Sequence, residues 1–490
     1  MNHTLNEKVR TATKWSVITE VAAKLVTPLS TMVLARLLTP DAFGVLVTAT
    51  MVIYFAEIFT DAGFQKYIIQ KEFDSEVELY RSTNVAFWSN LCLSCLIWLV
   101  IAIFSSDIAH LVGSDGYGLV VAVSCVCIPF AAFSSIQMAL LKRSLDFKTL
   151  FAVRIVGIMV PIVVTIPIAY FTRSYWSLII GMIARECVNA IVLTYFSPFK
   201  PRFTYQVSLF KSMFSFTFWS MLESVSIWLT SYLDIFIVGT ILSTYYMGVY
   251  RTSMNIVSQI MLVVTASTTP ILFSALSRLQ NDRGEFTKMF MNFQRMVAIL
   301  IIPMGVGIFL YSEAITNILL GSQWSEASDF IGWWGLTGAL VIIFSHYASE
   351  IYRSLGKPKV SVLAQVLHLV CLIPTVYLSI GYGFETLVVC RSLIRLQMIL
   401  VNAVLLWLIV RMSLWQMLYN CRNIFVATLA MAAIAYLLPE TKALGWQILQ
   451  MLLCAVVYFV VLCSFSKERA MLMQLIQAFA GKLSRKQTNQ

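Results

Sequence analysis

Two arginines spaced four residues apart, Arg391 and Arg395, stand inside a long apolar run of this chain. Residues with this spacing lie on one face of an α-helix, so both guanidinium groups project from the same face. Within a membrane, two like charges on one face are tolerated only where that face meets water, a carboxylate or an anionic ligand. A guanidinium donates two parallel hydrogen bonds to phosphate, so we expect an anionic phosphate group as the ligand.

Two further cations stand at comparable positions in other apolar runs, Arg185 in the sixth and Lys24 in the first. We therefore predict a water-filled central cavity whose substrate-binding residues are Lys24, Arg185, Arg391 and Arg395. The alternative is that the cations pair with acids of neighbouring helices, for which the candidates are Glu57, Glu186 and Glu223. Glu20 lies four residues before Lys24, so a purely structural ion pair on that helix is a second alternative.

Three acids inside apolar runs, Glu57, Asp61 and Glu223, are candidates for coupling transport to an ion. A carboxyl group held in an apolar environment keeps its proton more readily, which suits proton exchange. Glu57 and Asp61 share a helix face, so we expect one of them to be protonated. The sequence leaves open whether protons, sodium or neither drives transport.

These residues must be positioned by membrane-spanning helices. The chain has 490 residues, of which 59% are hydrophobic and only 12% charged, with a mean hydropathy of +0.80; a soluble domain carries about 25% charged residues. A spanning helix needs about twenty apolar residues. The sequence predicts an all-α integral membrane protein of about fourteen such helices, at 12–37, 44–64, 83–105, 117–141, 150–171, 175–197, 214–241, 245–274, 287–310, 330–354, 359–380, 385–410, 422–438 and 445–464.

The connecting loops alternate in charge. If the N-terminus is cytoplasmic, nearly all Lys and Arg of the loops fall on the cytoplasmic side, with Arg173 and Lys442 as exceptions. Cytoplasmic loops of membrane proteins carry such an excess. We therefore expect a multi-pass protein of the inner membrane with both termini cytoplasmic, and we assign the net charge of +11 to loops that touch anionic lipid rather than to nucleic-acid binding.

The chain also repeats itself. Residues 38–45, which carry Gly44, resemble residues 242–249, which carry Gly248. Arg143-Ser144-Leu145 matches Arg353-Ser354-Leu355, and the same offset places Arg185 opposite Arg395. These matches predict two six-helix lobes in parallel orientation, at 1–200 and 201–412, followed by two added helices within 413–466 and a cytoplasmic tail at 467–490.

Motifs for covalent chemistry are missing from the sequence, which contains no P-loop, no zinc-binding spacing and no serine-hydrolase motif. We therefore expect a protein that is not an enzyme, with no catalytic residues, no metal and no cofactor. The ten cysteines lie mostly in apolar runs, and we interpret them as small hydrophobic residues. Trp324, Trp333 and Trp334 are expected to anchor helices at the membrane interface.

Several motifs of the N-terminal third occur together: Lys14-Trp15-Ser16, then Val33-Leu34-Ala35-Arg36-Leu37-Leu38, Pro40-x-x-Phe43-Gly44, Asp61-x-Gly63 and Ile68-Ile69-Gln70. Gly321-x-x-Trp324 follows much later in the chain. This set resembles the Wzx-type polysaccharide flippases of the multidrug/oligosaccharidyl-lipid/polysaccharide exporter superfamily, and it is most similar to the branch that exports colanic-acid-like and teichuronic-acid-like polymers. The position of Arg36 in the Leu-Ala-Arg motif favours a structural role for this residue.

The resemblance implies two six-helix lobes arranged in a V. It also implies a function, transfer of an undecaprenyl-diphosphate-linked oligosaccharide from the cytoplasmic to the periplasmic leaflet by alternating access, for exopolysaccharide, capsule or O-antigen export. The partners it implies are this substrate, membrane lipids and other proteins of polysaccharide assembly. The main alternative is a cation-coupled multidrug antiporter of the same superfamily; a membrane polymerase or glycosyltransferase and a purely structural scaffold fit the sequence less well.

Overall fold

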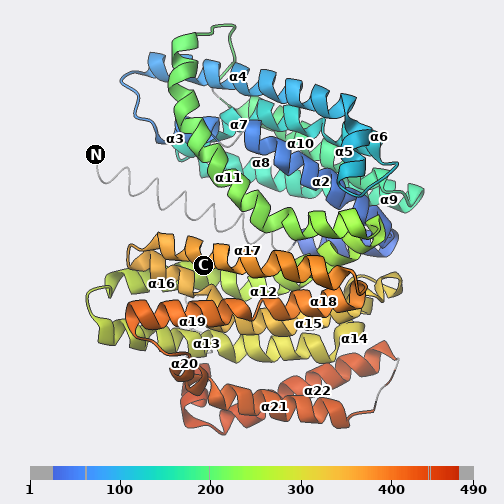
Figure 1. The fold of residues 1–490 in the computed structure, drawn as a ribbon, viewed down its shortest axis with the longest axis vertical. Helices are drawn as coiled ribbons and strands as arrows, with labels where there is room; N and C mark the ends of the chain where they lie inside the picture. Colours follow the sequence, from blue (N-terminus) through green and yellow to red (C-terminus); the bar gives the residue numbers. More distant parts are fainter. Residues whose placement is uncertain (1–25, 61–62, 198, 440, 442, 474–490) are drawn as a thin grey trace, which may run out of the picture. The chain divides into compact units, whose positions relative to one another are not determined.

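The computed structural model describes residues 26–60, 63–197, 199–439, 441 and 443–473, and the regular elements in this part are all helices (Figure 1). Ten of the described helices are long and apolar enough to cross a membrane, or up to twelve if each of two bent helix pairs is one span. The predicted all-α membrane fold is confirmed. The number of about fourteen spans stays a prediction, because the first predicted span begins in residues outside the described part.

The chain forms two compact units, which are described separately. Unit 1 comprises Met1–Thr252 together with Leu319–Trp324, and unit 2 comprises Ser253–Ile318 together with Ser325–Gln490. These units are defined by packing, whereas the predicted lobes were defined by counting helices. The lobes at 1–200 and 201–412, the added helices within 413–466 and the tail at 467–490 therefore remain predictions.

Unit 1 is built from the helix Val26–Leu37 and a series of helices that ends within the first turns of α12. These are α2 (Pro40–Thr60), α3 (Phe64–Gln70), α4 (Glu76–Ile103), α5 (Ser105–Leu111), α6 (Gly118–Ser124), α7 (Cys127–Arg143), α8 (Phe147–Val160), η1 (Pro161–Thr165), α9 (Ile166–Thr172), α10 (Trp176–Phe196), α11 (Val207–Ile241), α12 (Thr244–Arg278) and the short η2 (Ser322–Trp324).

Unit 2 contains the rest of α12 and the later helices. These are α13 (Arg283–Leu310), α14 (Ser312–Leu319), α15 (Ala327–Val341), η3 (Ile342–His346), α16 (Ala348–Ser354), α17 (Pro358–Ile380), α18 (Phe384–Ile394), α19 (Gln397–Val410), α20 (Leu414–Asn420), α21 (Arg422–Leu437) and α22 (Leu444–Cys463). The last two helices pack side by side, and α21 also packs on α13. Figure 1 shows this pair along one edge of the unit.

Polar side chains satisfy the backbone where helices begin and end. Ser75 caps the start of α4 by accepting from the Glu78 amide, and Ser413 forms a capping box with Gln416 at the start of α20. Such caps bind amide groups that have no partner within the first turn of a helix. At the C-terminal end of α3, Arg143 Nη1 donates to the carbonyls of Ile68 (2.8 Å) and Lys71 (2.6 Å).

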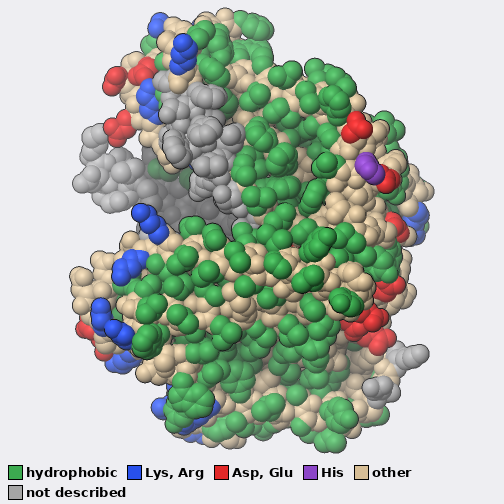
Figure 2. All heavy atoms as spheres, in the orientation of Figure 1, with side chains coloured by type: hydrophobic (Ala, Val, Ile, Leu, Met, Phe, Trp, Pro, Cys, Tyr) green, Lys and Arg blue, Asp and Glu red, His purple; other side chains and the backbone are tan. Residues whose placement is uncertain are grey.

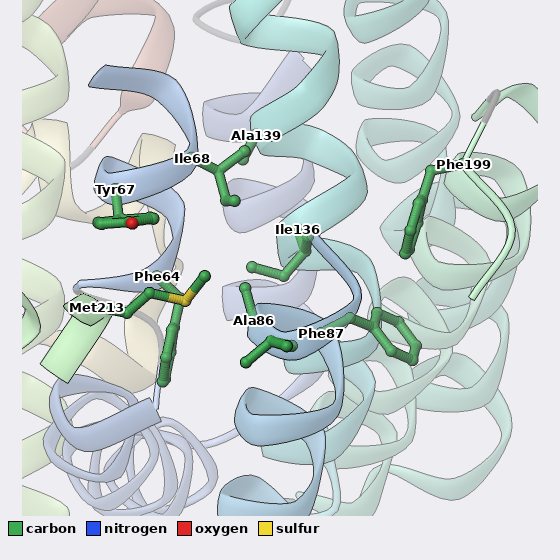
Figure 3. Packing of buried hydrophobic residues seen from close by; sticks show 10 residues of the cluster. Phe64, Tyr67, Ile68, Ala86, Phe87, Ile136, Ala139, Phe199 and Met213 are labelled. Carbon is green, nitrogen blue, oxygen red and sulfur yellow. The ribbon is translucent and has the colours of Figure 1, made fainter. Parts of the chain in front are cut away.

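The core of unit 1 joins α3, α4 and α7 with the segment between α10 and α11. Phe87 of α4 lies at its centre, in edge contact with Phe133 and Phe199 at centroid distances of 5.3 and 6.0 Å. Figure 3 shows Ile136 and Ala139 of α7 facing the same cluster. Because these side chains are apolar and interlocked, the cluster fixes how α4 and α7 pack.

The two repeated segments cross each other at the starts of α2 and α12, within unit 1. A Cβ atom on Gly44 would lie 1.9 Å from the carbonyl oxygen of Thr244, and one on Gly248 would lie 2.0 Å from that of Pro40. Each glycine therefore faces the residue four positions before the other glycine. This reciprocal contact places the two repeated segments in equivalent positions, and only glycine leaves room for it.

Residues 321–324 also belong to unit 1, where they bind the end of its first helix. Gln323 Nε2 donates to the carbonyls of Ala35 (2.5 Å) and Leu38 (2.6 Å), and the Trp324 indole donates to Ala35 O over 2.9 Å. The Trp324 side chain is fully buried. The prediction that Trp324 anchors the chain at the membrane interface is therefore wrong, because its N–H is bound to a helix-end carbonyl and its ring packs on Phe43.

Candidate transport site

A cluster of charged side chains lies inside unit 1. Two of its helices, α2 and α10, are long and apolar enough to cross a membrane, and the third, α12, is so as a bent pair of segments. Glu57 comes from α2, Arg185 and Glu186 from α10, and Arg251 from α12. Glu57 follows Tyr54 by about one turn of α2, which packs on α10. Arg185 lies beside Glu186 on α10, and Arg251 lies over Tyr232, whose ring contacts Tyr54. The cluster thus combines two carboxylates with two guanidinium groups, so its formal charges cancel.

Arg185 is the most exposed member of this cluster. Its Nε atom lies 3.9 Å from Glu186 Oε1, and 56% of its side chain is accessible, against 24% for Glu186. Glu186 is one of the acids named as an alternative partner for the predicted cationic residues. An exposed guanidinium with one loosely bound carboxylate retains donors for a second anion.

A row of aromatic side chains borders the charged cluster. The Arg251 guanidinium lies over the Tyr232 ring at 5.0 Å, and Tyr232 contacts Tyr54 on one side and Trp228 on the other, at centroid distances of 5.8 and 5.9 Å. Trp228 in turn lies 4.9 Å from Phe55. The row therefore runs from charged neighbours at Tyr54 and Tyr232 to apolar neighbours at Phe55 and Trp228.

The far side of this row faces an apolar cavity of about 1060 Å³. Phe55 and Trp228 line it, together with α4 residues such as Cys92 and Leu96 and with Leu233 of α11. This volume lies just above the range usual for ligand sites, about 300–1,000 Å³. An amphiphilic molecule could place its polar head beside the charged cluster and its apolar chain in the cavity, on opposite sides of the aromatic row.

Unit 2 holds the predicted arginine pair, and both members lie over one indole ring. The guanidinium carbons of Arg395 and Arg391 are 3.6 and 4.9 Å from the ring centroid of Trp334, and Arg395 Nη1 also donates to the Trp334 carbonyl over 3.3 Å. An aromatic face attracts cations and so offsets part of the repulsion between two arginines. Arg391 is buried, with 6% of its surface accessible.

Arg395 packs beside a glycine of α15. A Cβ atom on Gly338 would lie 3.4 Å from Arg395 Nη1, an ordinary contact distance. Trp334, one turn earlier in α15, has only 5% of its surface accessible. The expectation that Trp334 is an interface anchor is therefore wrong, because its ring is buried beneath two arginines.

The predicted site residues are thus spread over both units. Arg185 and Glu57 lie in unit 1, whereas Arg391 and Arg395 lie in unit 2. Lys24 and Asp61 fall outside the described residues, and the side chain of Glu223 does as well. The central cavity that would bring the cations together stays a prediction, as does ion coupling by the three acids.

The sequence did not predict two features of the site, Arg251 and the apolar cavity. Arg251 is absent from the predicted site residues, and its contact with Tyr232 places it in the cluster. The sequence feature that could have indicated Arg251 is its position three residues after the repeated Gly248. Nothing in the sequence distinguished the residues that line the apolar cavity from others that face lipid.

Charged side chains on the surface of unit 2 gather at its two ends. In Figure 2, Lys and Arg lie where Figure 1 labels α16, α19 and α20, and Asp and Glu lie near α14. Arg353 of α16 and Glu313 of α14 are examples. In this view Lys and Arg are thus more numerous at the end that carries α16, α19 and α20.

Long apolar helices that carry charged groups beside an apolar cavity are the organisation of a membrane transporter. The family model described as "Polysaccharide biosynthesis protein" matches residues 33–329. The chain belongs to this family, which confirms the family resemblance of its N-terminal motifs and its multi-pass membrane character.

One relative is similar to this chain in sequence, and two solved structures are similar to it in fold. The succinoglycan biosynthesis transport protein ExoT of Rhizobium meliloti is 23% identical over 68% of this chain and 67% of its own length. The lipid II flippase MurJ, in an inward closed conformation, has a similar fold with a TM-score of 0.74 and 14% identity, over 93% of this chain and 99% of MurJ. An inward-facing multidrug resistance transporter of the MATE family gives a TM-score of 0.59 with 12% identity, over 82% and 96% of the two chains.

Proposed function

We propose that this protein is a flippase that moves an undecaprenyl-diphosphate-linked oligosaccharide from the cytoplasmic to the periplasmic leaflet of the inner membrane, for polysaccharide export. One observation carries the proposal: in unit 1, an aromatic row places a charged cluster next to a cavity with apolar walls. A lipid-linked sugar diphosphate has the same division between an anionic head and a long hydrocarbon chain. Membership of a polysaccharide biosynthesis family supports this substrate class.

In this proposal the head and the chain of the substrate are held by different residues. Arg185, Arg391 and Arg395 bind the diphosphate and the sugar through charge-assisted hydrogen bonds. The hydrocarbon chain lies in the apolar cavity between α4 and α11, where it stays out of water. Alternating access follows if the substrate binds the inward-open and outward-open states with different affinity, since a ligand shifts an equilibrium only by that difference.

The proposed protein is not an enzyme, because moving a lipid across the bilayer breaks no covalent bond. The proposed orientation places both termini in the cytoplasm. We also propose other proteins of polysaccharide assembly as partners. Glu57, Asp61 and Glu223 remain the proposed groups for proton or sodium coupling.

A multidrug antiporter is the second candidate function, since its fold is also similar. Its usual cargo is cationic, and a site for cations requires carboxylates and aromatic faces. The charged cluster of unit 1 contains such groups in Glu57, Tyr54 and Tyr232. The stacked pair Arg391 and Arg395 in unit 2 favours an anionic substrate instead.

Filling the apolar cavity is expected to slow transport. In a Cys92→Trp variant, the indole occupies space on α4 that the proposal assigns to the hydrocarbon chain, and we expect flipping to fall by about tenfold, which corresponds to about 1.4 kcal/mol. Flipping is measured in proteoliposomes as the fraction of a lipid-linked oligosaccharide accessible to a membrane-impermeant reagent.

Cys463→Trp is the matched control. Cys463 is also an exposed cysteine of a spanning helix, but it lies at the end of α22 and does not line the cavity. Equal flipping rates for both variants and the parent protein would exclude the cavity as the site of the hydrocarbon chain.

A further inference from the structure

A second cavity, of about 590 Å³, lies at one end of unit 2 and has the opposite chemical character. It is formed by α13, by the bend between α20 and α21, and by the segment after α22, which is helical again from 466 to 473. Its lining is mainly polar or charged and includes Arg295, Gln416, Arg422, Asn423, Lys467 and Glu468. None of these side chains belongs to the proposed transport site.

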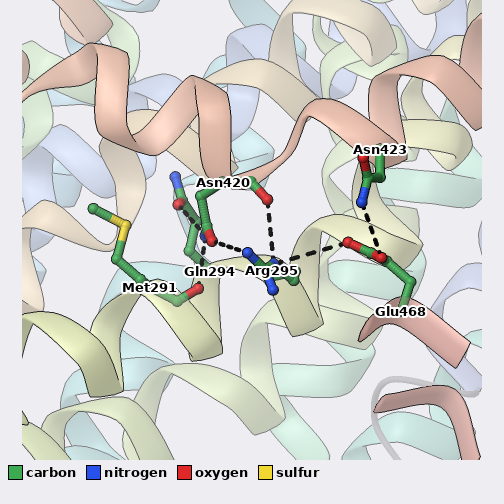
Figure 4. A network of polar contacts seen from close by, with 6 residues as sticks. All are labelled: Met291, Gln294, Arg295, Asn420, Asn423 and Glu468. Carbon is green, nitrogen blue, oxygen red and sulfur yellow. Dashed lines mark hydrogen bonds and ion pairs between the residues drawn. The ribbon is translucent and has the colours of Figure 1, made fainter. Parts of the chain in front are cut away.

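A hydrogen-bond network fixes the floor of this cavity (Figure 4). Arg295 donates from Nε to the carbonyl of Asn420 over 3.2 Å and from Nη2 to its Oδ1 over 2.6 Å. The Asn420 amide donates in turn to Met291 O over 2.8 Å and to Gln294 Oε1 over 3.1 Å. Arg295 is therefore held in one orientation before any ligand arrives, which lowers the entropic cost of binding.

Glu468 closes the network from the segment after α22. Its side chain is 1% accessible, and its Oε1 lies 4.0 Å from Arg295 Nε. Its Oε2 accepts from Asn423 Nδ2 over 3.1 Å. A buried carboxylate needs such partners. Both oxygens of Glu468 are thus engaged, and the acid compensates only one cation.

Three cations line the cavity against this single carboxylate. Arg422 lies 3.9 Å over the ring of Tyr419, and Lys467 is exposed. Neither forms an ion pair with any residue that the structure describes. With Arg295 balanced by Glu468, the cavity has a formal charge of +2 from Arg422 and Lys467.

The backbone adds to this positive field. Helix α21 begins at Arg422, its preceding residue Cys421 makes no side-chain cap, and the helix is 16 residues long. The first amides of a helix bind anions, and the helix dipole places about half a positive charge at this end. The helix start therefore supplements the side chains of Arg422 and Asn423.

We propose that this cavity binds a phosphate-bearing anion, the headgroup of an anionic phospholipid. Phosphate suits the exposed guanidinium of Arg422 with Lys467 nearby. Arg295, whose Nε and Nη2 donate to Asn420, retains the donors of Nη1. A lipid source fits the location on α13 and at the ends of α21 and α22. Helices α13 and α22 are long and apolar enough to cross a membrane, and α21 is so together with α20. Exposed Tyr419 and half-buried Phe465 supply apolar surface at the rim, where acyl chains would leave.

The proposal is independent of the flippase function, because the cavity uses neither the charged cluster of unit 1 nor the arginines of α18. The same chemistry would also accept free phosphate. The alternative is that the network is purely structural: it connects α13 to the last two helices and binds no ligand.

The test uses the purified full-length protein with Arg422→Gln and Lys467→Gln combined. Both side chains are exposed, so the double variant is expected to fold. Phosphatidylglycerol is titrated into detergent-solubilised protein, and the midpoint of thermal unfolding and the bound lipid in native mass spectrometry are recorded. Phosphatidylethanolamine and inorganic phosphate are titrated in parallel arms.

We expect phosphatidylglycerol to bind the parent protein and raise its midpoint, and binding to the double variant to be about tenfold weaker, since two charged donors are lost. Arg469→Gln is the matched control, an exposed cation of the same segment that does not line the cavity, and it should bind as the parent does. Saturation by inorganic phosphate alone would reassign the site to a soluble anion and overturn the lipid source. Equal binding of phosphatidylglycerol by all three proteins would overturn the site itself.

Discussion

Replacing Arg395 by Gln is expected to abolish most polysaccharide export while the protein still reaches the membrane. Arg395 is the arginine closest to Trp334, with its guanidinium carbon 3.6 Å from the ring centroid. A hydrogen bond to a charged group contributes about 1.5–3 kcal/mol, which corresponds to a loss of about tenfold to a hundredfold in substrate affinity. Export is measured as polysaccharide released per cell, normalised to the amount of protein in the membrane.

Arg395→Lys should not restore export. Lysine keeps the charge, but it lacks the planar group that stacks on an indole and donates two parallel hydrogen bonds. Arg278→Gln is the control, because Arg278 is an exposed arginine at the end of α12. Export at the parent level by both Arg395 variants would remove Arg395 from the substrate site, and loss of export by Arg278→Gln would show that arginine loss acts nonspecifically.

Replacing Gly44 by Ala is expected to destabilise unit 1 strongly. The added methyl group would stand 1.9 Å from the Thr244 carbonyl oxygen, a backbone atom that moves only if α2 and α12 separate. Overpacking of this kind costs about 1–3 kcal/mol and sometimes more. Gly248→Ala should behave alike, since its methyl group would stand 2.0 Å from Pro40 O. The yield of monodisperse protein and its midpoint of thermal unfolding measure the effect.

Gly307→Ala is the matched control. It is also a helical glycine, in α13, but a Cβ atom at this position meets nothing within 4 Å. In a helix, alanine is favoured over glycine by about 0.8–1 kcal/mol, so this variant should be as stable as the parent or more so. If Gly44→Ala unfolded at the parent's midpoint, the close crossing of α2 and α12 would be refuted.

The membrane fold was predictable because apolar runs and their spacing report it directly. Runs of about twenty apolar residues define spanning helices in any context. The repeat was visible in short matches around Gly44 and Gly248, and the structure supplies its physical reason, a reciprocal contact that excludes side chains at both positions. Local patterns of this kind can be recognised in a single sequence.

Contacts between distant segments were not predictable in the same way. Gln323 binds Ala35, 288 residues earlier in the chain, and a glutamine in a single helical turn such as η2 carries no pattern that indicates such a partner. Trp334 shows the same limit, because a tryptophan near a helix end is typical of the membrane interface. Only the packing of α15 against α18 reveals that the ring lies beneath Arg391 and Arg395.

The candidate site was predicted through its charges but not through its apolar half. A charged residue inside an apolar run is conspicuous since it is costly there, which is why Arg185, Arg391 and Arg395 could be singled out. The walls of the cavity consist of residues such as Leu96 and Ile97. In sequence these are indistinguishable from side chains that face lipid.

The central claim is that this protein moves a lipid-linked oligosaccharide across the inner membrane. It is tested most directly by locating that lipid in a strain that lacks the gene but keeps its upstream glycosyltransferases. We predict that the lipid accumulates in the cytoplasmic leaflet and that restoring the gene relieves the accumulation. An unchanged distribution of the lipid, together with altered tolerance to cationic drugs, would contradict the claim and favour the antiporter.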